Sequence, residues 1–312
     1  MNRVPIAFAF DNNLVMPACV CISSLMMNAR EDTFYDIFIL HSGLDAMDFK
    51  QLDMLSQHYS NCKINYREVG EIFDAAYEVR NVTTPTYYRL LIPELITEYA
   101  KILYADVDMI FRMDLSDVYN IDMGNNYLAA TYDLGMNLGK AGQKYIDSVQ
   151  GLVQGEYLQA GFILLNAKLM NEDGIVAKFK AEARKKYKFQ DQDILNIVCR
   201  GRKMVIPWKY NMTDYSFSYL MNEPFLLTNK YANSDVEEAK RCGNLHYNGH
   251  KPWKKYSVNF DIWWEYYRKS PFFDEKFYFD FYYNRLNELD QLSLWKRIKV
   301  LCRYFVYGKR KI

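Results

Sequence analysis

The first seventy residues alternate short apolar runs with segments whose apolar residues recur at helical spacing. Residues 6–10, 34–40 and 62–69 are expected to be strands, and helices are expected to end near Met27 and to span residues 45–58. Strands that alternate with helices of this length form a parallel sheet with helices on both faces. The sequence therefore predicts an α/β fold, in which ligands bind beyond the carboxyl ends of the strands.

A second apolar run, residues 101–105, ends in two aspartates one residue apart, Asp106 and Asp108. Alternate side chains of a strand point to the same face, so the two carboxylates can converge. Converging carboxylates repel each other unless a cation lies between them, and Mg²⁺ or Mn²⁺ prefers oxygen ligands that it often shares with a phosphate. The pair predicts a metal site for a phosphorylated substrate, although the same spacing recurs at Asp191 and Asp193.

Composition excludes several classes of protein. The 312 residues carry a net charge of +1, which gives no electrostatic case for binding nucleic acid. The six cysteines form no C-x-x-C pair, so neither a zinc site nor a disulfide scaffold is predicted, and free thiols in a reducing cytosol fit best.

No apolar stretch approaches the length of a membrane span, so a cytoplasmic location is expected. Without a G-x-G-x-x-G or a P-loop motif, a nicotinamide dehydrogenase and a P-loop nucleotidase are disfavoured.

Polar residues cluster at four further places amid apolar runs. Each cluster has an ordinary structural explanation, such as a helix cap at Asp191, a surface ion pair at Arg89 or a buried core histidine at His246. Together the clusters provide what a nucleoside diphosphate needs: carboxylate and amide groups, a third metal ligand, and cations for the phosphates. The residues concerned are Asp11, Asn13, Arg89, His246, Gly249 and Lys251, beside the pair Asp106 and Asp108.

Six motifs occur in a fixed order between residues 4 and 253. They are Phe-Asp-Asn-Asn, Tyr-Tyr-Arg-Leu, Tyr-Ala-Asp-Val-Asp, Gln-Ala-Gly-Phe-Ile-Leu-Leu-Asn, Gln-Asp-Gln-Asp-Ile-Leu-Asn and His-Tyr-Asn-Gly-His-Lys-Pro-Trp. On these motifs the chain resembles glycosyltransferase family 8, the family of glycogenin and of bacterial lipopolysaccharide galactosyl- and glucosyltransferases.

The resemblance implies a GT-A fold, that is, one Rossmann-like nucleotide-sugar-binding domain with a mostly parallel sheet flanked by helices. It also implies a UDP-sugar donor, a saccharide or lipid-linked saccharide acceptor, Mn²⁺ or Mg²⁺ as cofactor, and retention of anomeric configuration. By position, the metal ligands would be Asp106, Asp108 and His246. The substrate contacts would be Ala9, Asp11, Asn13, Asn81, Arg89, Val107, Gln159, Gly161, Gly249 and Lys251, and the reaction centre would hold Arg89, Asp133, Asp191 and Gln192.

The chain departs from the family pattern in two places. Gln159 stands where relatives commonly carry asparagine, and one residue separates Gly249 from Lys251 where many members have two.

Retention allows two mechanisms. A carboxylate, Asp133 or Asp191, could form a covalent glycosyl intermediate. Alternatively, the acceptor could attack from the side of the leaving group while the departing phosphate takes its proton. Because Gln192 is an amide and therefore a poor nucleophile, the front-face attack is favoured.

The end of the chain is aromatic and then basic, which divides it into a catalytic domain over residues 1–262 and a helical extension over 263–312. From residue 291 onward there are seven basic residues and no acidic one. A basic amphipathic segment suits the anionic inner face of a cell membrane; the alternative is a terminal helix packed on the domain.

Two rival functions remain at this level. A haloacid-dehalogenase-type phosphatase also uses D-x-D after a strand, but it places the motif on its first strand and needs threonine or valine where Ile110 stands. A non-catalytic carbohydrate-binding protein would keep the fold without turnover.

Overall fold

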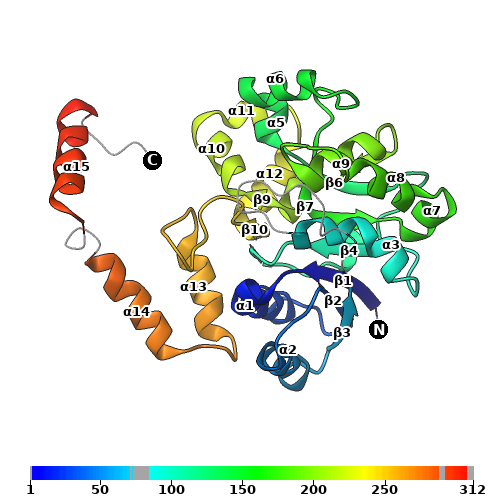
Figure 1. The fold of residues 1–312 in the computed structure, drawn as a ribbon, viewed down its shortest axis with the longest axis horizontal. Helices are drawn as coiled ribbons and strands as arrows, with labels where there is room; N and C mark the ends of the chain where they lie inside the picture. Colours follow the sequence, from blue (N-terminus) through cyan, green and yellow to red (C-terminus); the bar gives the residue numbers. More distant parts are fainter. Residues whose placement is uncertain (1, 71, 73–83, 288–291, 308–312) are drawn as a thin grey trace. The chain divides into compact units, whose positions relative to one another are not determined.

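The computed structural model describes residues 2–70, 72, 84–287 and 292–307. Its chain divides into two compact units, one up to Phe272 and one from Phe273 onward. The first unit contains the sheets and is described first (Figure 1).

A mostly parallel sheet forms the centre of the first unit. Among the described residues it has seven strands in the order β3-β2-β1-β4-β7-β6-β8, and β7 alone runs antiparallel to its two neighbours. The predicted α/β class is confirmed, and so are the three strands expected in the first seventy residues. The bounds are β1 Asn2–Ala9, β2 Thr33–His41, β3 Cys62–Glu68, β4 Ile102–Ala105, β6 Leu128–Tyr132, β7 Leu158–Leu165 and β8 Lys203–Val205.

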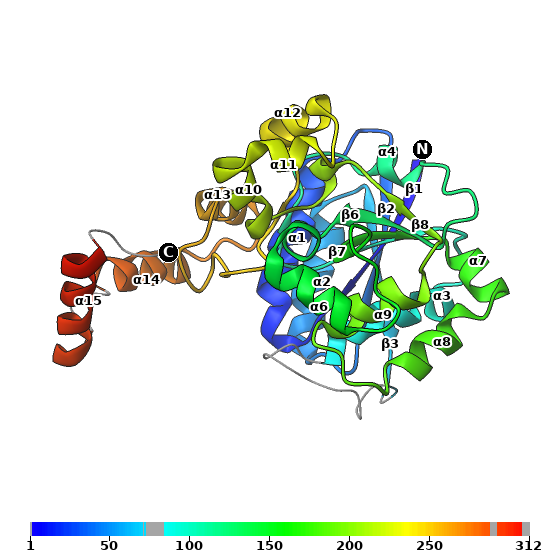
Figure 2. The same cartoon turned by 90° about the horizontal axis from the view of Figure 1, so that it is seen from above.

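Helices pack on both faces of this sheet, and Figure 2 shows it between α1 and α2 on one side and α3, α7 and α8 on the other. The helices of the first unit are α1 Val15–Met27, α2 Ala46–His58, α3 Ile92–Leu95, α4 Ser116–Tyr119, α5 Leu134–Leu138, α6 Lys140–Ser148, α7 Ala167–Glu172, α8 Ile175–Glu182, α9 Gln190–Val198, α10 Asp214–Asn222, α11 Pro224–Thr228, α12 Asn233–Cys242 and α13 Phe260–Lys269, with 3₁₀ turns η1 Asn12–Leu14, η2 Thr84–Leu91 and η3 Trp208–Tyr210.

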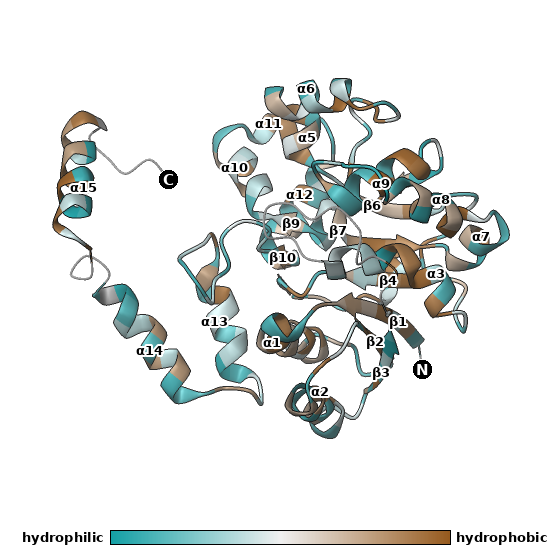
Figure 3. Cartoon of the chain, viewed as in Figure 1, coloured by the Kyte–Doolittle hydropathy of each residue, from teal (hydrophilic) through white to brown (hydrophobic). Residues whose placement is uncertain are grey.

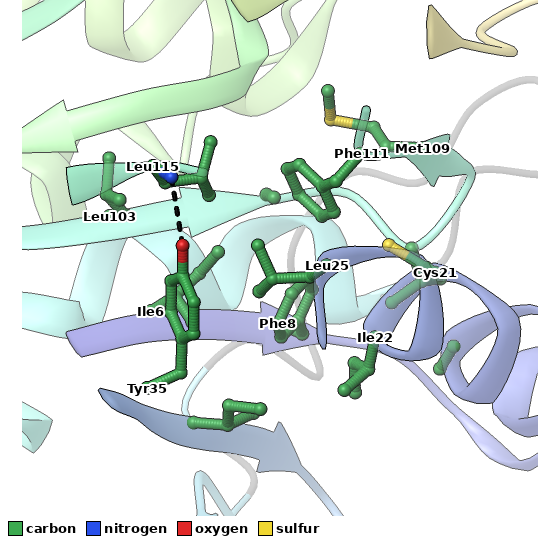
Figure 4. Close-up of a cluster of buried hydrophobic side chains, with 14 of the residues drawn as sticks. Ile6, Phe8, Cys21, Ile22, Leu25, Tyr35, Leu103, Met109, Phe111 and Leu115 are labelled. Carbon is green, nitrogen blue, oxygen red and sulfur yellow. Dashed lines mark hydrogen bonds between the residues drawn. The ribbon is translucent and has the colours of Figure 1, made fainter. Parts of the chain in front are cut away.

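Alternation along the strands builds a separate core on each face. Ile6 and Phe8 of β1 pack with α1 and α2, whereas Ala7 packs with η2, α3 and α9. Within the first core, the backbone N–H of Leu115 donates a hydrogen bond to the hydroxyl of Tyr35 (2.9 Å; Figure 4). A strand that is buried on both faces has a continuous apolar run in its sequence, and this is why β1 was predictable.

A second, smaller sheet joins distant parts of the chain at the carboxyl end of β4. Its strands are β5 Met109–Ile110, β10 Leu245–His246 and β9 Met212–Thr213, in the order β5-β10-β9. Because β5 follows β4 after three residues, the pairing of His246 with Met109 brings the imidazole beside Asp106 and Asp108.

The second unit contains two helices, α14 Glu275–Leu286 and α15 Leu294–Tyr307. At helical spacing, one face of α15 is apolar (Leu294, Ile298, Leu301 and Phe305) and the opposite face is basic (Lys296, Lys299 and Arg303); Figure 3 shows both hydrophobic and hydrophilic stretches along this helix. None of the helices described is both long and apolar enough to cross a membrane.

Candidate active site

A cavity of about 580 Å³ opens where β1 and β4 end. It brings together most of the predicted site residues, which come from segments more than 200 residues apart in the sequence. Those that line it are Ala9, Asp11, Arg89, Asp106, Val107, Asp108, Asp133, Gln159, Gly161, Asp191, Gln192, His246 and Lys251.

Three predicted substrate contacts are not among the lining residues. Asn13 is exposed, and its backbone N–H donates to the side chain of Asp11 (3.0 Å) at the start of η1. Gly249 is exposed, and its N–H lies 3.3 Å from the carboxylate of Asp214. Asn81 lies outside the described residues.

A carboxylate–carboxylate–imidazole cluster occupies one end of the cavity. One ligand atom each from Asp106, Asp108 and His246 lie within 4.8 Å of one another. Nε2 of His246 is 3.2 Å from Oδ1 of Asp108 and 3.7 Å from Oδ2 of Asp106. The three groups that the sequence proposes as metal ligands therefore converge on one point.

Each carboxylate directs a single oxygen into the cluster. Oδ1 of Asp106 accepts hydrogen bonds from Arg89 Nη2 and from the hydroxyl of Tyr104, both at 2.8 Å, which leaves Oδ2 facing His246. Tyr104 is a residue of β4 on the same face as Asp106. These two donors fix the rotation of the carboxylate before any cation binds.

Asp108 is held in the corresponding way by Lys251, whose ammonium group contacts Oδ2. Oδ1 is buried and accepts no hydrogen bond from the described residues. Burial alone would raise the pKa of Asp108, but the positive charges of Lys251 and His246 hold it below its usual range. A buried carboxylate oxygen without a hydrogen bond costs free energy unless a proton on Nε2 of His246, 3.2 Å away, satisfies it, and a hard divalent cation is a suitable partner in place of that proton. The residues present fit a divalent metal ion.

His246 is oriented by a neighbour that sequence reasoning missed. Its Nδ1 lies 2.9 Å from Oδ1 of Asn211, and the amide nitrogen of Asn211 donates to Gln159 (2.6 Å), so the Asn211 oxygen faces the ring as an acceptor. Nδ1 therefore carries the proton, and Nε2 faces the carboxylates. Burial lowers the pKa of His246, but the charges of Asp108 and Asp106 outweigh it and raise that pKa above its ordinary value. A cation in the cluster would take the place of a proton on Nε2.

Gly161 is required where β7 passes beneath the cluster. A Cβ at this position would lie 2.2 Å from Cε1 of His246 and 2.7 Å from Oδ2 of Asp106, distances that side-chain carbons do not reach. The glycine lets the imidazole and the carboxylate approach the backbone of the central sheet.

Arg89 joins this cluster to the other end of the cavity. It lies in the last turn of the 3₁₀ segment η2. Its buried guanidinium pairs with Asp106 and, through Nε at 3.0 Å, with Asp191, and it donates to the carbonyl of Ala160 (2.7 Å). Burial raises the pKa of Asp191 to about 6, against the opposing charge of Arg89.

Gln192 and Asp133 form the other pair at the reaction centre. The amide of Gln192 donates to Oδ2 of Asp133 (2.9 Å) and accepts from the backbone N–H of Ala160 (3.0 Å). Oδ1 of Asp133 caps α5 by accepting from Met136 (3.0 Å). Both side chains are therefore held in place before substrate binds.

The second D-x-D spacing has a structural role. Asp193 is fully buried, points away from Asp191, and accepts hydrogen bonds from the hydroxyls of Tyr145 and Tyr157, both at 2.6 Å. Residues two apart on a helix project to nearly opposite sides. Asp191 and Asp193 therefore do not converge as Asp106 and Asp108 do at the end of a strand.

The cavity also includes residues to which the sequence gave no role. They are Phe10, Leu14, Pro85, Thr86, Ala160, Lys188, Phe189, Gln190, Asn248 and Trp253. Several lie inside the quoted motifs, and Tyr104 could have been found from strand alternation alone. Asn211 had no such signal, because only the pairing of β9 with β10 brings it beside His246.

The sheet and the cluster at its edge define an α/β protein with a candidate site for a divalent metal. Residues 5–257 match the profile of glycosyl transferase family 8, so the chain belongs to that family and is a glycosyltransferase.

Two relatives agree with this assignment, and a solved structure has a similar fold. Glycosyltransferase GlyE of Streptococcus pneumoniae is 25% identical over 273 residues, which are 84% of this chain and 60% of GlyE. Lipopolysaccharide 1,3-galactosyltransferase of Salmonella typhimurium is 24% identical over 228 residues, 71% of this chain and 67% of the relative. The crystal structure of galactosyltransferase LgtC in complex with donor and acceptor sugar analogues is similar with a TM-score of 0.72 and 24% identity, covering 88% of this chain and 98% of LgtC. This similarity confirms the GT-A fold.

Proposed function

We propose that the protein is a retaining, metal-dependent hexosyltransferase that moves glucose or galactose from a UDP-sugar to a saccharide acceptor of a cell-surface glycan, such as lipopolysaccharide or capsule. The observation that carries the proposal is the cluster in which Asp106, Asp108 and His246 each direct one ligand atom to a common point inside the cavity. Lipopolysaccharide galactosyl- and glucosyltransferases among the relatives support the hexose and the acceptor class.

The metal is proposed to be Mn²⁺, with Mg²⁺ as the alternative, held by Asp106 Oδ2, Asp108 Oδ1 and His246 Nε2. When bound, such an ion supplies Lewis-acid stabilisation of a diphosphate leaving group, typically several kcal/mol. Lys251 would add positive charge to the same group. In the structure its ammonium contacts Asp108, so it is already positioned beside the proposed phosphate site.

Ala9, Asp11 and Asn13 are proposed to contact uridine, because they follow β1 at the edge where ligands of such sheets bind. Gly249 would present its backbone N–H to the diphosphate. That N–H now lies 3.3 Å from a carboxylate oxygen of Asp214, so it already faces an acceptor at the position proposed for phosphate.

The engaged carboxylates favour front-face attack over a covalent intermediate. Asp133 accepts from Met136 and Gln192, one donor for each oxygen. Asp191 accepts from Thr86 (2.7 Å) through one oxygen and pairs with Arg89 through the other. A carboxylate with both oxygens engaged is a weakened nucleophile, whereas a phosphate oxygen that takes the acceptor's proton needs neither group to break its contacts.

The Gln192→Ala variant should lower the rate of UDP release by about 10- to 100-fold without abolishing it. The variant loses two hydrogen bonds that order Asp133 and the backbone of Ala160, and each bond contributes about 1 kcal/mol. The rate is measured as UDP released from the preferred UDP-hexose. A sugar trapped covalently on Asp133 or Asp191, detected by mass spectrometry, would contradict front-face attack.

The function itself is tested by Mn²⁺-dependent release of UDP from UDP-glucose, UDP-galactose and their N-acetylated counterparts. Release from a hexose donor, lost on removal of the metal with a chelator, is the expected result. A protein that binds these donors without releasing UDP would instead be the non-catalytic alternative. The phosphatase alternative is wrong, since the chain belongs to a glycosyltransferase family and its D-x-D follows β4 rather than β1.

We further propose a cytoplasmic location with peripheral attachment to the inner face of the cell membrane through α15. Its apolar face and three of its four cations, Lys296, Lys299 and Arg303, lie on opposite sides of one helix, which is the pattern of helices that lie in a membrane surface. The acceptor would then be a lipid-linked saccharide.

Reversing three charges, Lys296→Glu with Lys299→Glu and Arg303→Glu, should weaken binding to vesicles containing anionic lipid by at least about 100-fold. Each cation near such a surface contributes about 1 kcal/mol. Flotation with anionic and with neutral vesicles measures the effect, and deletion of residues 291–312 should have the same result. The matched control reverses Lys168, Lys178 and Lys240 in the first unit; if it weakens binding equally, α15 is not the attachment site.

A further inference from the structure

A second cavity, of about 650 Å³, adjoins the first. Its wall contains Tyr145 and Ser148 of α6, and Lys185, Lys186, Tyr187 and Lys188 of the segment that precedes α9. Lys188 lines both cavities. The second cavity therefore borders the end of the active site that holds Asp191 and Gln192, at the proposed reaction centre.

Positive charge dominates this cavity. Residues 178–188 contain six basic residues and one acidic residue, Glu182. Among the residues that line the cavity, three lysines face this one carboxylate, which is already engaged by Lys185 (2.8 Å) and by the hydroxyl of Tyr187 (2.5 Å). With three lysines and one glutamate, the lining carries a net positive charge.

The wall is also fixed in position. The hydroxyl of Tyr145 donates to the buried Asp193 (2.6 Å) and accepts from the backbone N–H of Lys188 (3.1 Å). The ammonium of Lys188 lies over the rings of both Tyr145 and Phe189, 5.2 Å from each ring centroid. These cation–π contacts hold Lys188 where it lines both cavities. A cavity lined by tyrosines and lysines suits a sugar that carries a negative charge.

We propose that the second cavity binds an anionic group, phosphate or carboxylate, on the acceptor saccharide. The inference rests on the proposed function, which places the acceptor at the reaction centre. The donor has its own cations, the metal and Lys251, in the cluster formed by Asp106, Asp108 and His246. The lysines before α9 would then select an acceptor by its charge.

The test is a titration of the full chain with galactose 6-phosphate, galacturonate and galactose, without donor or metal. Binding is followed through the ring resonances of ¹³C-labelled Tyr145 and Tyr187, which line the second cavity but not the first. The charged sugars should bind about tenfold more tightly than galactose, and the preference should weaken with added salt. A preference shown by both charged sugars assigns a general anion site, and one shown by galactose 6-phosphate alone assigns a phosphate site.

The Lys185→Ala/Lys186→Ala variant should reduce the preference to less than about threefold, whereas the control Lys168→Ala/Lys240→Ala, with the same change in net charge, should keep it. Equal binding of charged and neutral sugars, or a preference that survives in Lys185→Ala/Lys186→Ala, would overturn the inference. Because the titration needs no turnover, such a result with UDP release intact overturns the anion site alone. Absence of UDP release from every donor overturns the proposed function instead.

Discussion

Replacing Asp108 with asparagine should lower the rate of UDP release by at least about 1000-fold. The amide has nearly the same shape as the carboxylate, so the change removes charge and a metal ligand while it keeps the packing. Oδ1 of Asp108 is the buried oxygen that accepts no hydrogen bond from the described residues, and we propose that it binds the metal. A loss of about 4 kcal/mol in stabilisation of the leaving group corresponds to a thousandfold in rate.

Thermal unfolding separates this effect from misfolding. Mn²⁺ with UDP should raise the melting temperature of the wild-type protein and leave that of Asp108→Asn unchanged. The matched control is Asp122→Asn, which removes an exposed carboxylate from a loop and should retain full activity. If Asp108→Asn kept more than about a tenth of the wild-type rate, the proposed metal site would be wrong.

Replacing Gly161 with alanine should lower the rate by at least about 100-fold while the chain still folds. The new methyl group would lie 2.2 Å from the His246 ring and 2.7 Å from Asp106, so at least one proposed ligand must move. The ring has little room, since it is buried and Asn211 holds it through Nδ1. The backbone has little more, because β7 is bonded to strands on both sides.

The readout is the affinity for Mn²⁺ in the presence of UDP, measured beside the melting temperature of the metal-free protein. A loss of metal affinity with a melting temperature lowered by only a few degrees is expected. Normal metal affinity in Gly161→Ala would mean that the cluster in the structure is not the metal site.

The central strands and the position of the polar residues at their ends were predictable from the sequence, because local pattern determines both. The apolar runs of β1 and β2 have the length and composition of buried parallel strands, and the polar residues that follow them could only lie at the carboxyl edge. The ordered motifs then linked His246 to the aspartates, a connection that no local pattern provides.

Other features depend on contacts between distant segments. Asn211 reaches His246 only because β9 pairs with β10, and the 3₁₀ conformation at Arg89 accompanies its buried ion pairs with Asp106 and Asp191. Position 161 needs glycine because the side chains of His246 and Asp106, which come from other segments, approach the backbone there. Propensity and periodicity carry no information on such contacts, since these arise only when the sheet has formed.

The central claim is that Asp106, Asp108 and His246 hold a divalent cation that is shared with the diphosphate of the donor. Isothermal titration calorimetry of UDP into the full chain, with and without Mn²⁺, tests it most directly. Because coupled binding is reciprocal, Mn²⁺ should tighten the binding of UDP by at least about tenfold, and UDP should tighten the binding of Mn²⁺ by the same factor. Equal affinity for UDP in the presence and absence of the metal would contradict the claim.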